Sequence, residues 1–368
     1  MTSSRPDAGP KERWALFGLA SAAVSGRIPP DLGIALADSA PLALAAEAQR
    51  LQIHTMIGPV LDRHPDLGAA MPPDLVLFFR AMHAANRARL AEGLAQLRTI
   101  GAALAAAGIP ALVLKGGGDM LSPLHRDPAL RYVGDLDILV PSGRAGQTLA
   151  ALRGMGAAPA SPRAHATSRF DWRGQRLPRH HLPRLVRPGW TFPVEIHVRA
   201  GPDALATALD PVAMLRDGVP TAIPGLSVGS SEDRACHLIL HAARHEGRVA
   251  LRAWIDWVSL RRMCDRASVA DRLGRAGHGR AFATCEVMAD RLDAAGAPPM
   301  PHHDRAALHA ALAALAPSES RSIADIVRFL YRRGRGLALS PAYRRHIAAR
   351  ILEHRLLRDI TGRRGADR

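Results

Sequence analysis

The segment LVLKGGGDMLSPLHRDPALRYVGDLDILVP, residues 112–141, decides the fold because two short apolar runs in it flank three consecutive glycines. The first run, 109–114, ends just before the glycines, and the second covers 135–140. Both have the length and composition of strands. In the second run Asp135 and Asp137 are two residues apart, so strand alternation places both carboxylates on one face of a sheet.

Two carboxylates this close repel each other unless a cation lies between them or water solvates them. A hard ion such as Mg²⁺ binds through a few carboxylates and the phosphates of a substrate. The alternative is an exposed edge strand with solvated aspartates, which is the commoner arrangement for an isolated D-x-D. The pair alone therefore leaves both interpretations open.

The residues before the pair favour a phosphate site. Lys115 is one of only two lysines in the chain, the other being Lys11, although Lys and Arg together number 49. It precedes glycines that would let backbone N–H groups approach an anion, with the dipole of a following helix behind them. The segment matches neither a P-loop nor a dinucleotide fingerprint. A glycine-rich turn without a ligand is the alternative.

A third predicted strand, 194–199, adds another acid. Alternation in VEIHVR places Glu195, His197 and Arg199 on one face. A third carboxylate on a neighbouring strand would complete a two-metal site for phosphoryl or nucleotidyl transfer. Glu195 could equally be a solvated surface acid.

The rest of the chain reads mostly as helices. Apolar residues at three-to-four spacing and Pro or Gly breaks predict helices at 12–24, 40–62, 74–107, 142–154, 231–246, 249–265, 279–294, 304–315, 321–333 and 341–361. Residues 219–229 look like an extended crossover, and 157–193 stay unassigned apart from a hairpin near 167–177. The expected fold class is α+β, a small mixed-sheet core flanked by N-terminal helices and a C-terminal helical bundle. The expected domains are 1–84, 85–229 and 230–368.

Composition limits the classes of protein. With 368 residues and 48% hydrophobic residues the chain can bury a sizeable core. No apolar stretch is long enough for membrane insertion, no signal peptide is recognisable, and three cysteines without metal-ligand spacing favour a reducing, cytoplasmic location. The formal charge of +16 makes nucleic acid a conceivable partner. Because nearly all basic residues are arginines spread over the chain, we do not favour that partner.

The ordered motifs LVLKGG, LRYVGDLDILV, VEIHVR and HLILHAARHEGRVALRAWIDW resemble an uncharacterised bacterial nucleotidyltransferase family of the polymerase-beta-like nucleotidyltransferase superfamily. The resemblance covers about residues 85–260, and members often occur in clusters for peptide natural products or surface polysaccharides. It implies that 85–229 form the nucleotidyltransferase core. Two departures are a longer spacer at 118–134 and Glu195 where Asp is usual.

The resemblance also implies roles for individual residues. Catalysis and metal binding fall to Asp135, Asp137 and Glu195. Nucleotide binding falls to Lys115, Gly116, Gly117 and Arg131. The residues expected beside this site, without a settled role, are His197, His241, His245 and Asp256.

The expected reaction is Mg²⁺-dependent transfer of an NMP from an NTP, with ATP as the first candidate, to an unknown acceptor, with release of pyrophosphate. Two ions are expected. The acceptor would be a peptide, a sugar or another small molecule. One alternative is a catalytically degenerate module of the same fold that binds RNA or a partner protein. Another is transfer of the γ-phosphoryl group from the same metal site.

His237, His241 and His245 lie at intervals of four residues on one predicted helix. Two histidines at this spacing can ligate zinc. However, Ala242 follows His241 where H-E-x-x-H would have its glutamate, and no further ligand is evident. Packed or nucleotide-contacting histidines are therefore favoured over zinc ligands. Trp254 and Trp257 on the next helix are expected in the core, facing the histidine helix.

Overall fold

The computed structural model describes residues 9–160, 169–170, 176–177, 180–201, 208–244 and 250–294. Contacts group residues 1–160 and 180–316 into one compact unit, which contains every element below except one hairpin. That hairpin pairs β4 (Arg169–Phe170) with β5 (Arg176–Leu177) in antiparallel orientation, where the sequence predicts a hairpin. The predicted helices at 304–315, 321–333 and 341–361 lie outside the described residues.

Six helices precede the first strand, and most of them form where the apolar spacing predicts helices. They are α1 (Pro10–Ser25), α2 (Leu32–Ala37), α3 (Pro41–Arg50), α4 (His54–Arg63), α5 (Pro65–Ala69) and α6 (Pro73–Ala106). The single helix predicted at 40–62 is wrong. Gln52 has a φ of 59°, which a right-handed helix excludes, and the chain turns there between α3 and α4.

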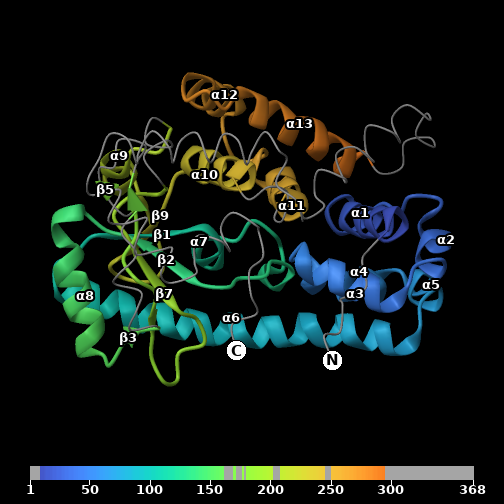
Figure 1. Ribbon diagram of the computed structural model, residues 1–368, viewed down its shortest axis with the longest axis horizontal. Coiled ribbons are helices and arrows are strands. Elements are labelled where there is room, and N and C mark those ends of the chain that lie inside the picture. Colours follow the sequence, from blue (N-terminus) through green and yellow to red (C-terminus); the bar gives the residue numbers. More distant parts are fainter. Residues whose placement is uncertain are drawn as a thin grey trace. The chain divides into compact units, whose positions relative to one another are not determined.

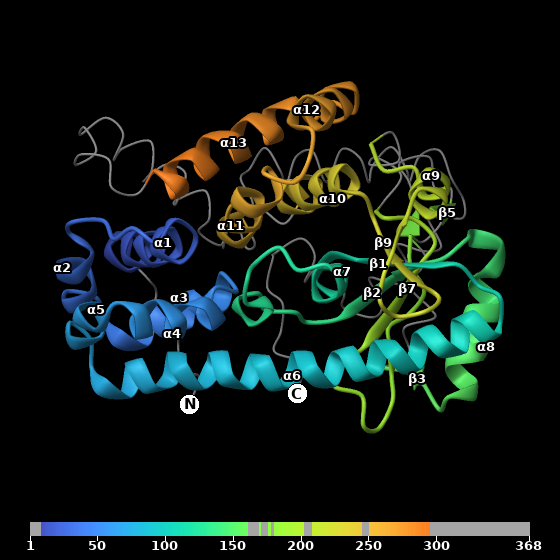
Figure 2. The ribbon, with the colours of Figure 1, turned by 180° about the vertical axis from the view of Figure 1, so that it is seen from behind.

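Helix α6 connects two hydrophobic clusters. Near its start, Phe79 packs in a cluster with the other N-terminal helices, whereas Leu97 and Leu104 near its end pack in a second cluster with strand residues. Figures 1 and 2 show α6 running beside α3–α5 and then along one face of the sheet. With 34 residues it is long enough to support both parts.

A mixed sheet of seven strands lies on the far half of α6, in the order β3-β6-β7-β2-β1-β9-β8. Its central strands are β1 (Ala111–Leu114), β2 (Leu136–Leu139), β7 (Val194–His197) and β9 (Leu226–Val228). The outer ones are β3 (Ala158–Pro159), β6 (Leu185–Val186) and β8 (Val219–Pro220). β2 pairs with β1 in antiparallel and with β7 in parallel orientation. The predicted crossover 219–229 forms β8 and β9, and β9 lies parallel to β1.

Alternation along the three central strands gives the sheet two different faces. Val113, Ile138 and Ile196 point into the cluster with α6. Asp137 and Glu195 pair in register and point to the other face, where Figures 1 and 2 show α10. The carboxylates therefore lie on the side of the sheet that faces α10.

Short elements connect the strands, and four longer helices follow them. The connections are α7 (Lys115–Leu121), η1 (Pro128–Leu130), η2 (Ser142–Arg144), α8 (Ala145–Gly154) and α9 (Pro211–Arg216). The last helices are α10 (Ser231–Arg244), α11 (Ala250–Leu260), α12 (Arg266–Arg275) and α13 (Gly279–Asp293). Helix α11 ends five residues before its predicted end at 265. The α+β prediction is confirmed, and the division at 84 and 229 stays a prediction.

Both tryptophans of α11 are buried, as predicted, with Trp254 at 5% and Trp257 at 0% exposure. Trp257, however, faces α13: its Nε1–H donates to Glu286 Oε1 at 2.8 Å and its ring meets Phe282 edge-on. The expected packing of Trp257 against the histidine helix stays a prediction.

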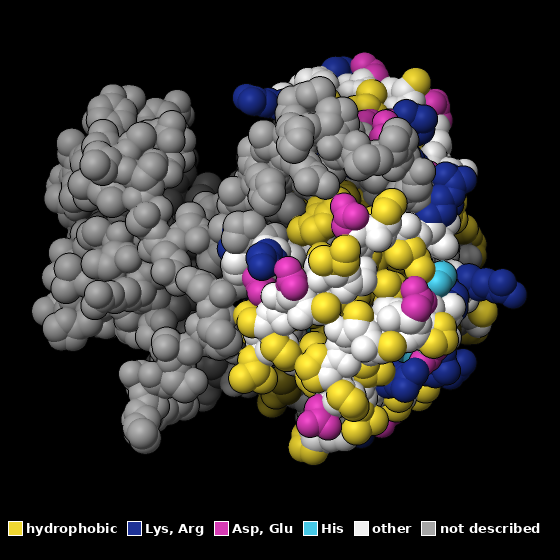
Figure 3. All heavy atoms as spheres, turned by 90° about the vertical axis from the view of Figure 1, so that its right-hand side faces the viewer, with side chains coloured by type: hydrophobic (Ala, Val, Ile, Leu, Met, Phe, Trp, Pro, Cys, Tyr) yellow, Lys and Arg dark blue, Asp and Glu magenta, His cyan; other side chains and the backbone are white. Residues whose placement is uncertain are grey.

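The face of the molecule in Figure 3 carries many hydrophobic side chains, and its Lys and Arg side chains are mixed with Asp and Glu toward one edge. On this face the positive charge of the chain does not gather into one continuous basic surface. None of the described helices combines the length and the apolar character that crossing a bilayer requires.

Candidate functional site

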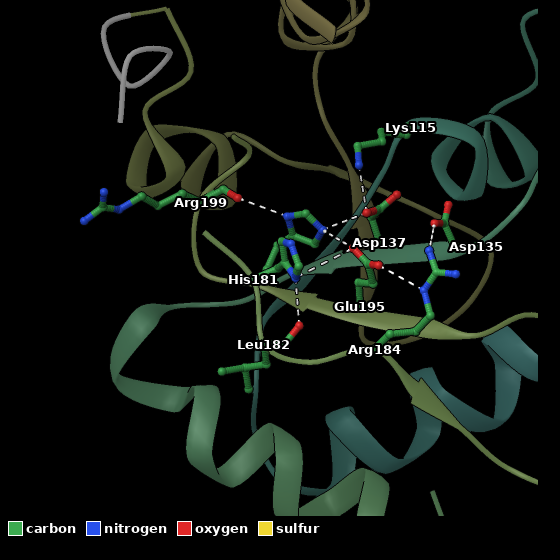
Figure 4. Close-up of polar contacts among 9 residues, drawn as sticks. Lys115, Asp135, Asp137, His181, Leu182, Arg184, Glu195 and Arg199 are labelled. Carbon is green, nitrogen blue, oxygen red and sulfur yellow. Dashed lines mark hydrogen bonds and ion pairs between the residues drawn. The ribbon is translucent and has the colours of Figure 1, made fainter. Parts of the chain in front are cut away.

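Asp137 is the centre of the site. Its side chain is 1% exposed, and its Oδ1 accepts from Lys115 Nζ at 2.9 Å and lies 2.7 Å from His197 Nε2 (Figure 4). Its Oδ2 is buried and has no hydrogen-bond partner among the described residues. Buried carboxylate oxygens without a partner are costly, so this oxygen favours the binding of a cation or another donor.

Glu195 lies beside Asp137 because β2 and β7 pair in parallel with these two residues in register. Its Oε2 is 3.7 Å from His197 Nε2. One ligand atom each from Asp137, Glu195 and His197 lies within 4.8 Å of the others, the sole such grouping found in the described part of the chain. The three residues could hold one divalent cation.

Asp135 lies one residue before β2 and outside this group. An arginine holds it: Arg184 donates from Nη2 to Asp135 Oδ2 at 2.9 Å and from Nε to Glu195 Oε1 at 3.1 Å (Figure 4). The guanidinium therefore occupies the position between Asp135 and Glu195 that a cation shared by them would take. Arg184 itself is 47% exposed, which leaves it room to move.

The carboxylates differ in pKa. Burial alone would raise the pKa of Asp137, but Lys115 and His197 outweigh burial and hold this pKa well below its usual range. Burial likewise opposes ionisation of Glu195, yet His197 and His181 lower its pKa to about 2. The pKa of Asp135 is raised by burial and by the charge of Asp137. Asp137 and Glu195 are therefore ionised at neutral pH, as metal ligands must be.

Lys115 reaches Asp137 through an unusual backbone conformation. It is the first residue of α7 and has a φ of 50°, in the left-handed region that side chains other than glycine rarely adopt. Non-glycine residues in this region cost about 1 kcal/mol or more and concentrate at functional sites. This conformation lets its ammonium group project from the end of β1 over the acidic face of the sheet.

The three glycines form the first turns of α7, where a phosphate loop was expected before a helix. All are buried, and a Cβ on Gly117 would lie 2.8 Å from Val113 Cγ1. A Cβ on Gly118 would lie 2.7 Å from the carbonyl oxygen of Val113. The glycines therefore allow α7 to pack closely on β1. Nucleotide binding by Gly116 and Gly117 stays a prediction.

Arg131 is buried, at 6% exposure, and lies in a network of charges. Its Nη1 is 2.9 Å from Asp119 Oδ2 and its Nε donates to Asp256 Oδ2 at 2.8 Å. Asp256 also contacts His125 Nε2 at 3.0 Å, and Arg234 Nη2 donates to Asp119 at 2.7 Å. Asp256 thus holds Arg131, and its expected place beside the site stays a prediction. Binding of a nucleotide by Arg131 stays a prediction.

The three histidines predicted to share one helix differ in what the structure shows of them. His237 is 5% exposed, and burial together with the charge of Lys115 lowers its pKa to about 3. The ring of His241 meets it edge-on at 6.4 Å, and His245 lies outside the described residues. Within the described ranges no histidine of α10 belongs to a metal-binding group, so the structure gives the zinc alternative no support.

Two residues near the site were not predicted from the sequence. Arg184 and His181, whose Nδ1 is 3.8 Å from Glu195 Oε2, both come from the unassigned stretch 157–193. The run RHHLPR, residues 179–184, was the available signal, since two adjacent histidines flanked by arginines just before an acidic strand are unusual.

Comparison with known proteins identifies the family of the chain. No curated protein and no solved structure matched. A family model described as an uncharacterised nucleotidyltransferase matches residues 38–292, a span that includes the three-residue group, α7 and helices α10–α12. Because the match covers more than half of the chain, the protein belongs to this uncharacterised nucleotidyltransferase family.

Proposed function

We propose that the protein transfers an NMP from an NTP, with ATP as the first candidate, to a hydroxyl-bearing acceptor and releases pyrophosphate in a Mg²⁺-dependent reaction. The observation that carries the proposal is the buried Asp137, with one oxygen bound by Lys115 and His197 and the other without a partner. Family membership supports the reaction class. The acceptor class, a peptide, a sugar or another small molecule, rests on the resemblance stated above.

Asp137 and Glu195 would hold the metal, and Asp135 would join them once Arg184 releases it. The bound ion would supply Lewis acidity, neutralising phosphate charge and lowering the pKa of the acceptor hydroxyl. The free carboxylate oxygen of Asp137 favours cation binding, and three acids in one place would suffice for two ions.

Lys115 and Arg184 are the two cations that can face the triphosphate. Lys115 is 26% exposed and Arg184 47% exposed, and each is now neutralised by site carboxylates. When a cation satisfies those carboxylates, both side chains become available to phosphate oxygens, where they would stabilise the departing pyrophosphate. Arg131, which Asp119 and Asp256 hold, would stabilise the predicted nucleotide-binding segment that begins at Lys115.

The test measures the thermal unfolding midpoint with each of the four NTPs, with and without Mg²⁺. A ligand that binds only the folded state raises the midpoint. We expect a Mg²⁺-dependent rise with one NTP that disappears in Asp137→Asn and Glu195→Gln. The control is Asp217→Asn, which removes an acid that is 53% exposed and paired with exposed Arg216.

Absence of any rise would overturn the proposal and favour the degenerate module, for which RNA binding would weaken steeply with salt and ignore the three acids. Label on the α-phosphate that reaches an acceptor would support nucleotidyl transfer. Transfer of the γ-label would instead show kinase-type chemistry. The three cysteines carry free thiols, which fits the cytoplasmic location that we expect.

A further inference from the structure

The orientation of His197 is fixed by its backbone partner. Its Nδ1 lies 3.2 Å from the carbonyl oxygen of Arg199. A carbonyl oxygen can only accept a hydrogen bond, so Nδ1 carries the proton and donates. The imidazole therefore turns its other nitrogen, Nε2, toward Asp137 and Glu195.

This arrangement requires positive charge at Nε2. In the neutral ring Nε2 would present a lone pair to Asp137 Oδ1 at 2.7 Å and to Glu195 Oε2 at 3.7 Å. Lone pairs of three acceptors facing one another repel, so either a proton or a metal ion must lie among them. Histidines that ligate metals characteristically donate their other ring N–H to a carbonyl or carboxylate, as His197 does here.

The group also contains an oxygen that is available to a metal ion. Asp137 Oδ2 is buried without a partner in the described part of the chain. Glu195 and His197 each place a ligand atom within 4.8 Å of one of the two Asp137 carboxylate oxygens. The strand pairing of β2 with β7 fixes all three residues on rigid backbone. These ligands offer one nitrogen and two carboxylates.

We propose that His197 is a metal ligand together with Asp137 and Glu195, so that the site takes a divalent first-row transition-metal ion, for which Mn²⁺ serves as the probe, in preference to Mg²⁺. This inference rests on the proposed function for the place of the metal, and it replaces Mg²⁺ there as the preferred ion. Mg²⁺ demands oxygen ligands in near-octahedral geometry, whereas imidazole strengthens binding of transition metals. A ligand set with a buried imidazole is therefore poorly matched to Mg²⁺.

A second feature supports an imidazole-rich site. The rings of His180 and His181 lie 5.7 Å and 5.3 Å from the ring of His197. His181 Nδ1 approaches Glu195 Oε2 at 3.8 Å, which puts a second imidazole beside the same carboxylate. Only His197 is nevertheless close enough to both acids to belong to the group.

The test uses the full chain, freed of metal with a chelator, and follows binding of Mn²⁺ alone by electron paramagnetic resonance. We expect one bound Mn²⁺ that Mg²⁺ displaces only at about tenfold or greater excess. Electron spin echo envelope modulation should show coupling to a directly bound ¹⁴N. His197→Gln should remove this coupling and weaken Mn²⁺ binding about tenfold or more. His180→Gln, which changes a neighbouring ring outside the group, should keep both.

Bound Mn²⁺ without ¹⁴N coupling, or equal displacement by Mg²⁺, would overturn the inference. Both readings come from the wild-type chain, so they decide the matter even if His197→Gln does not fold. A midpoint rise with Mg²⁺ and an NTP but no Mn²⁺ preference would overturn this inference and leave the proposed function standing. Mn²⁺ coupled to ¹⁴N without any effect of NTPs would support the inference and overturn the proposed function.

Discussion

Lys115 combines a charge that the site needs with a backbone conformation that lysine disfavours. Its φ of 50° places it in the left-handed region, and its ammonium group meets Asp137 Oδ1 at 2.9 Å. Three glycines follow immediately, and each could adopt this conformation without strain. A lysine nevertheless stands at the strained position, which indicates that the ammonium group is worth more there than the strain costs.

The two effects can be separated by replacing Lys115 with alanine or with glycine. Both variants remove the ammonium group, but only glycine relieves the left-handed strain. We expect Lys115→Gly to exceed Lys115→Ala in free energy of unfolding by about 1 kcal/mol, because a Cβ in this region costs about that much. Urea titration measures the difference. Equal stability would contradict the assigned backbone conformation. Both variants should lose the NTP-dependent rise in unfolding midpoint, which tests the role of the charge.

At the level of elements, alternation made the central strands predictable. Asp137 in β2 and Glu195 in β7 each alternate with apolar neighbours on their own strand, which fits strands with one face in a core. β9 was expected only as part of an extended crossover, because three residues between proline and glycine turns carry too little pattern to define a strand. The glycine segment was expected as a loop because glycine is a poor helix former. Packing on β1 overrides that preference, since any side chain at Gly118 would collide with the strand.

The close packing of α7 on β1 predicts different outcomes for two Gly→Ala variants. At Gly118 a Cβ would lie 2.7 Å from the carbonyl oxygen of Val113, a backbone atom that cannot turn aside. We expect Gly118→Ala to lower the free energy of unfolding by about 2 kcal/mol, in the range of overpacked cores. Gly146 in α8 has open space around its Cα, so Gly146→Ala should raise the free energy of unfolding by about 0.5–1 kcal/mol. Chemical denaturation of both variants tests this. A mild effect at Gly118 would mean that α7 can shift away from the strand.

Some contacts of the site could be predicted from the sequence, and others could not. Lys115, Asp137 and Glu195 lie on or beside strands whose pairing follows from their pattern, so their meeting was predictable. Arg184 comes from a segment without periodicity, and its contact with Asp135 spans 49 residues. The burial of Arg131 depends on Asp256, which lies 125 positions away on another helix. Neither contact joins two patterned strands, so no local pattern encodes it.

Across the whole molecule, buried charges connect the sheet region to the C-terminal helices. Arg131 precedes β2, Asp119 belongs to α7, and Asp256 belongs to α11. Burial would raise the pKa of Asp256, but the charge of Arg131 holds it well below its usual range. Networks of this kind depend on every member, because a buried charge without its partner is costly.

Acid should destabilise the molecule partly through His237. Burial and the charge of Lys115 lower its pKa to about 3, against about 6.5 in an unfolded chain. Above pH 6.5 the ring is neutral in both states. Below pH 6.5 the His237 ring binds a proton in the unfolded chain but stays neutral in the folded protein. The free energy of unfolding therefore falls, by about 1.4 kcal/mol per pH unit toward pH 3.

His237→Gln should remove this slope. Urea titrations between pH 7 and 4 measure it, and the difference between wild type and variant isolates His237 from other titrating groups. Parallel curves for wild type and His237→Gln would show that the buried ring is protonated in the folded protein.

The network also predicts that the sheet region and the C-terminal helices lose stability together. Asp256→Asn leaves the buried guanidinium of Arg131 with Asp119 as its remaining acidic ion-pair partner among the described residues, and should lower the free energy of unfolding by about 3–5 kcal/mol. Hydrogen exchange measured by mass spectrometry locates the effect. Peptides from α7 should lose protection by the same factor as peptides from α11, because Arg131 ties both to one cooperative unit. Exposed Asp217→Asn should change neither. Loss of protection confined to α11 would show that the helices unfold independently of the acidic site. In that case the proposed boundary near 229 would separate two cooperative units, and Arg131 would be free to serve the nucleotide instead of the fold.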